Sequence, residues 1–186
     1  MPSLRARNRA RVRHEIQDAA WRLFAEHGFA AVTTQQIATA AGVSTSTYFR
    51  HVASKEDLLL QPLLASSADI LAAYAARPAD EPVARGLAAA IRGRTAEAAD
   101  TDLRRWRAAM LTAPELGSRV TLIADADRGE LVRLAADRHG SGLVVHLVLA
   151  AAEYAYSRWI DPSAGEQSLV ALIDAALDET LTGDWR

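Results

Sequence analysis

Cysteine is absent from this chain of 186 residues. Its absence excludes a disulfide framework, a thiolate zinc site and a cysteine nucleophile. No apolar run approaches the roughly 18 residues of a membrane span, and the charged N-terminus is not followed by the hydrophobic stretch of a secretory signal. We therefore expect a cytoplasmic protein with no membrane partner.

The common catalytic signatures are also missing. The sequence has no GxSxG, no phosphate-binding P-loop, no glycine-rich dinucleotide turn and no HExxH, and its five histidines show no metal-ligand spacing. An active site would therefore have to be formed by residues that come together only in the folded protein and that match none of these motifs. We expect no enzyme, no metal and no cofactor.

Aromatic residues are few, at 6%, whereas apolar residues make up 50% of the chain and alanine dominates them. Because β-branched residues never alternate over more than a few positions, an all-α fold is expected. Apolar periodicity, capping residues and helix breakers predict nine helices. These cover about 10–27, 33–41, 44–51, 54–78, 82–99, 100–112, 114–139, 143–160 and 164–182.

Positive charge gathers at one end of the chain. Residues 1–56 carry seven arginines and one lysine against four carboxylates, a net +4, which leaves −6 for the remainder. An uneven distribution of this kind indicates an anionic partner for the first segment.

A helix-turn-helix is predicted over roughly residues 34–52. Gly42 permits a left-handed residue in the turn between the two short helices. One face, expected to pack inward, consists of Ile37, Ala41, Val43, Tyr48 and Val52. The opposite face of the second helix then presents Thr45, Ser46, Phe49 and Arg50, with Thr47 at its edge.

This outward face suits the DNA major groove, because the N-terminal residues of a recognition helix, here Thr45 and Ser46, reach base edges first. Arg50 could form a bidentate contact to guanine or sit on a phosphate, and Gln35 or Gln36 could read adenine. Phosphates would be held by Thr34, His51 and Lys55, together with the free N–H groups at the start of the next helix. The alternative is that Ser44 to Thr47 are only a polar capping run.

The run TTQQIATAAGVSTSTYFRHV over residues 33–52, followed by Ser54-Lys55-Glu56-Asp57-Leu58, resembles the TetR family signature. The resemblance implies a nine-helix homodimeric repressor with a DNA-binding head at 1–56 and a helical body at 57–186 for effector binding and dimerisation. It further implies that a small effector releases the protein from operator DNA. Phe49 departs from the usual tyrosine, which removes a hydroxyl expected on a phosphate, and Val52 replaces a common phenylalanine.

Arginine recurs at every second position in Arg5, Arg7, Arg9, Arg11 and Arg13. This spacing lines one edge of an extended strand but scatters around a helix. It therefore suggests an extended arm whose first three arginines follow the minor groove or phosphates. A solvated tail that only steers association is the alternative.

The last two helices could pair with their copies in a four-helix dimer interface, through Ala150, Ala151, Ala152, Ala155 and the stripe from Leu169 to Leu181. These stripes could equally close the core of a single chain. Candidate effector contacts are Tyr74, Trp106, Met110, His146 and Tyr154, which favour a largely apolar ligand.

Pro62 should kink the fourth helix, which could then transmit ligand binding to the head. A protein that binds DNA or a protein partner without any effector remains the rival interpretation.

Overall fold

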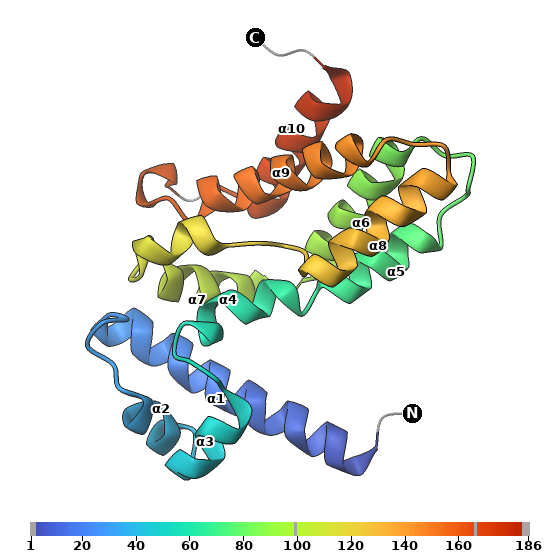
Figure 1. Cartoon of the computed structure of the whole chain (residues 1–186). Coiled ribbons are helices and arrows are strands. Elements are labelled where there is room, and N and C mark those ends of the chain that lie inside the picture. Colours follow the sequence, from blue (N-terminus) through green and yellow to red (C-terminus); the bar gives the residue numbers. More distant parts are fainter. Residues whose placement is uncertain (1–2, 99, 166, 184–186) are drawn as a thin grey trace. The chain divides into compact units, whose positions relative to one another are not determined.

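The computed structural model describes residues 3–98, 100–165 and 167–183, and all regular secondary structure in these ranges is helical (Figure 1). The α-helices are α1 Leu4–His27, α2 Thr34–Ala40, α3 Thr45–His51, α4 Asp57–Leu64, α5 Ser67–Ala75, α6 Val83–Glu97, α7 Asp100–Met110, α8 Asp125–Asp137, α9 Gly142–Trp159 and α10 Leu169–Thr182. Two 3₁₀ helices, η1 Pro114–Arg119 and η2 Pro162–Ala164, lie between them. The all-α class is confirmed, with ten α-helices in the described ranges instead of nine.

Two predicted helices are interrupted. The helix expected over 54–78 is divided by a turn at Ala65 and Ser66, three residues after Pro62. The helix expected over 114–139 is replaced by η1, a non-helical stretch and α8. That stretch is held by Ser67, whose hydroxyl accepts a hydrogen bond from the Ala124 N–H at 3.0 Å and donates one to Asp127. Sequence periodicity carries no signal for such a distant side-chain partner.

The chain divides into two compact units, which we call the head and the body. The head comprises residues 1–61 and 100–117, and the body comprises residues 62–99 and 118–186. The head therefore extends beyond the sequence-based boundary at residue 56 and takes in α7. This addition follows from the packing of α1 against α7 as well as against α2 and α3.

The core of the head forms on one face of α1, because its apolar residues recur at helical spacing. Ile16, Ala20 and Phe24 are fully buried, and the Phe24 ring meets Phe29 edge-on at 5.0 Å between centroids. Further members of this core come from the other helices of the head and from the segments that join them, among them Val32, Ile37, Tyr48, Val52, Leu58, Leu59, Trp106 and Met110.

The prediction of an extended arginine arm is wrong. Helix α1 begins at Leu4, so the arginines at alternate positions are distributed around a helix. Arg11, for example, forms an ion pair with Glu15 one turn later and a hydrogen bond to Asn8. Alternation alone did not indicate an extended strand here, because alanine and arginine both favour a helix.

Pro62 lies inside α4 and alters its hydrogen bonding. Because proline has no N–H, the Leu58 carbonyl four residues earlier lacks its usual helical donor. The indole N–H of Trp21 donates to this carbonyl at 2.9 Å, and the indole N–H of Trp106 donates to the next one, Leu59, at 2.7 Å. Two buried tryptophans of the head thus hold the first turn of α4.

The body is a bundle in which α9 packs against α10, α6 and α8, while α5 packs against α6 and α8. Its core includes the fully buried Leu87, Leu131, Leu149 and Leu177. At one end the Arg138 guanidinium donates to the carbonyls of Tyr74, Ala75 and Arg77 and lies over the Tyr74 ring at 4.6 Å. Arg138 therefore caps the C-terminal end of α5.

Residues 57–75 qualify the expectation of no apolar run long enough for a membrane. By length and composition this stretch could cross one. However, it forms two helices separated at Ala65 and Ser66, and it contributes the buried Leu58, Leu59, Ile70 and Tyr74 to the protein interior. Core packing therefore uses part of its apolar character.

Candidate nucleic-acid interface

The turn between α2 and α3 has the predicted backbone. Gly42 adopts φ +68°, and a Cβ at this position would meet no atom within 4 Å. Glycine is therefore required by the left-handed conformation and not by crowding. The Val43 N–H returns to the Ala38 carbonyl at 3.0 Å, which fixes the end of α2.

Both short helices are capped by their own side chains. In α2, the Thr33 hydroxyl accepts from the Gln36 N–H at 3.2 Å while Gln36 Oε1 accepts from the Thr33 N–H at 2.8 Å, a reciprocal capping box. This arrangement uses the amide oxygen of Gln36. Gln35 is exposed beside it and is therefore the better candidate for reading a base.

The two faces of α3 are divided as the periodicity predicts. Tyr48 is fully buried and Val52 nearly so, whereas Thr45, Ser46 and Arg50 are exposed. The inward direction of Tyr48 follows from its position one turn before Val52 on an apolar stripe. A short polar helix is thus held against the head by one side and open to solvent on the other.

Hydroxyl groups at the start of α3 form a local network. Ser44 Oγ accepts from the Thr47 N–H at 3.1 Å and lies 3.0 Å from Ser46 Oγ and 2.9 Å from Thr47 Oγ1. Capping therefore occupies part of the hydrogen-bonding capacity of Ser46 and Thr47. A hydroxyl can donate and accept at once, so Ser46 remains able to bind a further group, and Thr45 is exposed next to it.

Phe49 is a large apolar side chain on this polar face. Its exposed fraction is 58%, and its ring stands edge-on to Tyr48 with centroids 5.3 Å apart. Burial raises the pKa of the Tyr48 phenol to about 12, with smaller contributions from Glu56 and Asp57. Tyr48 therefore stays neutral, and its buried ring packs against the exposed Phe49 ring.

Lys55 does not lie where a phosphate anchor is expected. Its ammonium donates to the carbonyls of Phe29 at 2.7 Å and Val32 at 3.0 Å, and it lies 4.2 Å from the centroid of the Phe29 ring. Two of its three donors are used within the head. Lys55 thus fixes the connection from α1 to α2, which sequence spacing could not reveal, and its predicted contact to a phosphate would have to use the remaining donor.

The start of α4 is likewise occupied by protein groups. Ser54 Oγ accepts from the Asp57 N–H at 3.2 Å, and Asp57 Oδ2 accepts from the Ser54 N–H at 3.2 Å. The two residues thus form a reciprocal capping box. A carboxylate at this helix end disfavours the additional phosphate that the free N–H groups were expected to bind.

His51 lies in a basic environment that sequence reasoning only partly anticipated. Burial lowers the pKa of its imidazole, and the charges of Arg50, Arg9 and Arg13 lower it further. Arg9 and Arg13 come from α1, one turn apart on the same face. A cluster of positive charge therefore surrounds the end of α3, and its α1 members were not identified as partners of His51.

The residues proposed to surround an effector belong to different compact units of the chain. Trp106 and Met110 are buried in the head, whereas Tyr74 is buried in the body. His146 and Tyr154 lie on α9 with their side chains exposed, so neither is the buried polar group that was expected inside a pocket. Their spacing places them on the outer face of α9.

A hollow in the body lies between α5 and α6. It encloses about 150 Å³ and is lined by Asp69, Ala73, Arg77, Ala89, Ala90, Gly93, Arg94 and Glu97. This volume is below the roughly 300–1,000 Å³ of sites for drug-sized ligands.

Residues 16–61 match the family model for bacterial regulatory proteins of the tetR family. The whole chain is also similar to the HTH-type transcriptional regulator TcmR of Streptomyces glaucescens, with 29% identity over 205 aligned positions that cover 100% of this chain and 91% of the relative. A shorter match, 49% identical over 49 residues, covers 26% of this chain and 25% of the putative mycofactocin biosynthesis transcriptional regulator MftR of Mycobacterium tuberculosis.

Solved structures show the same fold at low sequence identity. The SmeT–triclosan complex superposes with a TM-score of 0.62 at 22% identity, over 92% of this chain and 90% of that one. NalD, described as the secondary repressor of the MexAB-OprM multidrug efflux pump in Pseudomonas aeruginosa, gives 0.58 at 19% identity, over 96% and 100% of the two chains. Both sequence relatives are described as transcriptional regulators, which agrees with the expectation that the chain is not an enzyme.

Proposed function

We propose that this chain, a member of the TetR family of bacterial regulatory proteins, is a cytoplasmic homodimeric repressor that leaves a palindromic operator when a small, largely apolar effector binds. The DNA-binding part of this proposal rests on one observation. The face of α3 with Thr45, Ser46 and Arg50 is polar and exposed, while Tyr48 on the opposite face is fully buried. A helix that packs against the head on one face and is exposed on the other can enter a major groove about 12 Å wide.

Only a few residues are proposed to contact the DNA bases. Thr45 and Ser46 stand at the N-terminal end that reaches base edges, and Arg50 supplies a guanidinium suited to the O6 and N7 atoms of guanine. Gln35 could read adenine from α2. Phosphate binding is assigned to Thr34, at the start of α2, and to the basic cluster of His51, Arg9 and Arg13.

The experiment is a binding titration with DNA selected from a random pool by the full-length protein. Replacing a bidentate contact to guanine costs about 1–3 kcal/mol, so Arg50→Ala should weaken binding about 5- to 150-fold and relax selection at one position in each half-site. Arg119→Ala removes an exposed arginine in the body and is the matched control. Equal effects of the two substitutions would contradict the role of Arg50.

Homodimerisation is supported by an apolar outer face on α9. Leu143, Leu147 and Tyr154 are exposed by 65%, 43% and 59%, and Val170 on α10 by 39%. By contrast, Ala152 and Ala155, with Leu169 and other members of the α10 stripe, are buried within the single chain. The dimer surface is therefore proposed on the outward residues, which include the exposed Ala150 of the predicted stripe, and not on the buried members of the stripes.

Two heads joined in this way would meet successive major grooves at about 34–36 Å or a multiple of it. Leu147→Glu places a charge in the middle of the proposed interface and should shift the protein towards monomer in sedimentation analysis. Val170→Glu, on α10, should act in the same direction. A protein that remains monomeric at all concentrations without substitution would exclude this arrangement.

Effector control is the least direct part of the proposal. Its support is the likeness in fold to SmeT, which is described in complex with triclosan. The hollow of about 150 Å³ between α5 and α6 is too small to hold such an effector, and the rival is a regulator that binds DNA without one. Screening apolar compounds for release of bound DNA separates the two, because a constitutive regulator would retain its DNA with every compound.

A further inference from the structure

An exposed aromatic ring lies on the face of α3 that is proposed to meet DNA. Phe49 is exposed by 58%, while Thr45, Ser46 and Arg50 beside it are polar. Single exposed apolar side chains are common on protein surfaces, so exposure alone assigns no role to this ring. Its position on α3 and its contact with Tyr48 indicate one.

The residues on the open face of α3 form two pairs. Because successive residues of an α-helix are rotated by about 100°, Phe49 lies next to Thr45, and Arg50 lies next to Ser46. The first pair carries a phenyl ring and a threonine methyl group beside its hydroxyl, whereas the second carries a hydroxyl and a guanidinium. The face is therefore divided lengthwise into a more apolar strip and a polar strip.

The Phe49 ring is held by a fixed neighbour. Its edge-on contact with Tyr48 has an interplanar angle of 89° and a centroid distance of 5.3 Å, and Tyr48 itself is fully buried in the head. A side chain that is already restrained loses less conformational entropy on binding than a free one. The exposed side of Phe49 is thus suited to a further contact.

The chemistry of this ring limits what it can contact on DNA. Phenylalanine has no hydrogen-bond donor or acceptor, so Phe49 cannot hold a phosphate oxygen. Hydrogen-bonding groups dominate the base edges in the major groove, and the C5-methyl group of thymine is the apolar group among them. We propose that Phe49 reads thymine by packing its ring against this methyl group. The inference deepens the proposed DNA-binding function and rests on it.

Phe49 and Arg50 together predict two features of each half-site. Arg50 is expected at a guanine, and Phe49, the preceding residue on α3, at a thymine. Since adjacent residues of one helix reach neighbouring parts of the groove, the two bases should lie within a few base pairs of each other.

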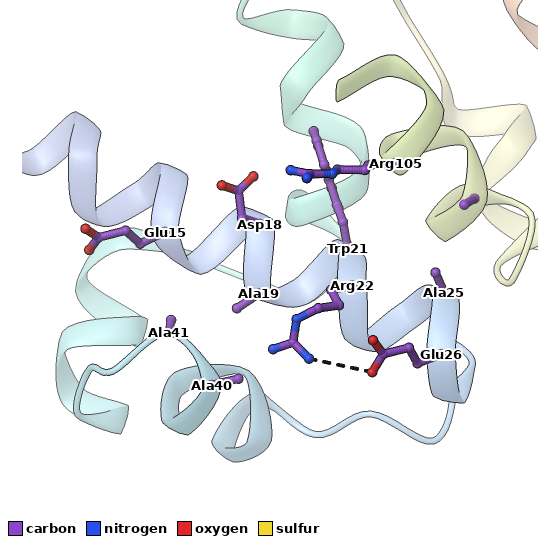
Figure 2. Close-up of a pocket in the computed structure, with 11 residues that line it drawn as sticks. Glu15, Asp18, Ala19, Trp21, Arg22, Ala25, Glu26, Ala40, Ala41 and Arg105 are labelled. Carbon is purple, nitrogen blue, oxygen red and sulfur yellow. Dashed lines mark ion pairs between the residues drawn. The ribbon is translucent and has the colours of Figure 1, made fainter. Parts of the chain in front are cut away.

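A groove along α1 is another place on the head where an apolar group could lie (Figure 2). It encloses about 560 Å³, but nearly half of its lining residues are charged, namely Glu15, Asp18, Arg22, Glu26 and Arg105. Figure 2 shows Arg22 directed towards Glu26, with which it forms an ion pair at 3.6 Å. Covering charged groups with an apolar partner removes them from water at a cost, which contact with the Phe49 ring does not incur.

The test uses the full-length protein and the DNA site that it selects from a random pool. Each thymine position is replaced in turn by deoxyuridine, in both half-sites together, which removes the C5-methyl group and keeps every hydrogen-bonding group of the base. Binding is measured by fluorescence anisotropy at one fixed salt concentration. Burial of one methyl group corresponds to about a fourfold change in affinity, so the replacement should weaken binding about 15-fold at one thymine position.

Two variants assign the contact to its side chain. Phe49→Ala removes the ring and should bind the thymine and deoxyuridine sites equally, to within about twofold. Leu4→Ala is the matched control, because Leu4 is a large apolar side chain on α1 of the head, exposed by 75%. This control should retain the difference of about 15-fold between the two DNAs. Far-UV circular dichroism establishes that each variant is folded.

The inference would be overturned if the unsubstituted protein tolerated deoxyuridine at every thymine position, or if Phe49→Ala showed the same loss as the unsubstituted protein. A selected half-site that specifies no thymine would also contradict it. These results leave the proposed function standing, because selection of a sequence is itself evidence of specific DNA binding. Absence of any selected sequence would instead contradict the proposed function, and the inference with it.

Discussion

Trp21 offers a quantitative test of how the head holds α4. Its indole N–H donates to the Leu58 carbonyl, to which Pro62 cannot donate. Trp21→Phe removes the donor and leaves a buried carbonyl unpaired, at a cost of about 1–3 kcal/mol. The smaller ring adds about 1 kcal/mol for the space it leaves. The free energy of unfolding should therefore fall by about 2–4 kcal/mol.

A second substitution tests this reasoning directly. Pro62→Ala restores an N–H that can donate to Leu58, so in that background Trp21→Phe should cost only the packing part, about 1 kcal/mol. Trp106→Phe is the matched control. Trp106 donates to Leu59, whose helical donor would be Leu63, and Pro62 does not remove that N–H. Its cost should therefore be the same in both backgrounds.

Urea unfolding followed by far-UV circular dichroism, at one fixed protein concentration, gives the four free energies of each cycle. We expect a coupling of about 1–3 kcal/mol between Trp21 and Pro62 and less than about 0.5 kcal/mol between Trp106 and Pro62. Additive costs for Trp21 and Pro62 would refute the assignment of the indole as the replacement donor.

Other predictions concern the turn, the loop and the basic cluster. Gly42→Ala should destabilise the protein by about 1–2 kcal/mol through its positive φ, and Gly42→Asn by less, as measured by urea unfolding. Lys55→Met should lower stability but leave the salt dependence of DNA binding unchanged, whereas a loss of about one unit of slope would restore its role as a phosphate anchor. His51 should titrate below its usual pKa near 6.5 in NMR, and Arg13→Ala should raise that pKa; no change would remove the α1 arginine from the cluster. The pKa of His51 is lower in the folded protein than in the unfolded chain, so folding favours the neutral imidazole. Its contribution to the free energy of unfolding is therefore fully present above the unfolded pKa and is lost as the pH falls from there through the folded pKa.

Local signals predicted the helix-turn-helix well. The inward face of α3 followed from the apolar spacing of Tyr48 and Val52, and the turn followed from Gly42, because both depend on residues close in sequence. The capping box at Ser54 and Asp57 likewise depends only on residues three positions apart. These features require no knowledge of a distant partner.

Features set by distant contacts were missed or misplaced. The role of Lys55 depends on carbonyls more than twenty positions earlier in the chain, and the non-helical stretch before α8 depends on Ser67. His146 and Tyr154 show a related failure: their chemistry suited a pocket, but their position on α9 turns them outward. The type of residue indicated the chemistry of these side chains, whereas tertiary packing determined where in the fold each side chain lies.

Selection of bound sequences from random DNA tests the central claim most directly. Two joined heads, each presenting Thr45, Ser46 and Arg50, should enrich an inverted repeat with half-site centres about 10–10.5 base pairs apart or a multiple of that spacing. Arg50→Ala should lose selection at one position in each half. Failure to enrich any sequence, or enrichment of a single asymmetric site, would contradict the account.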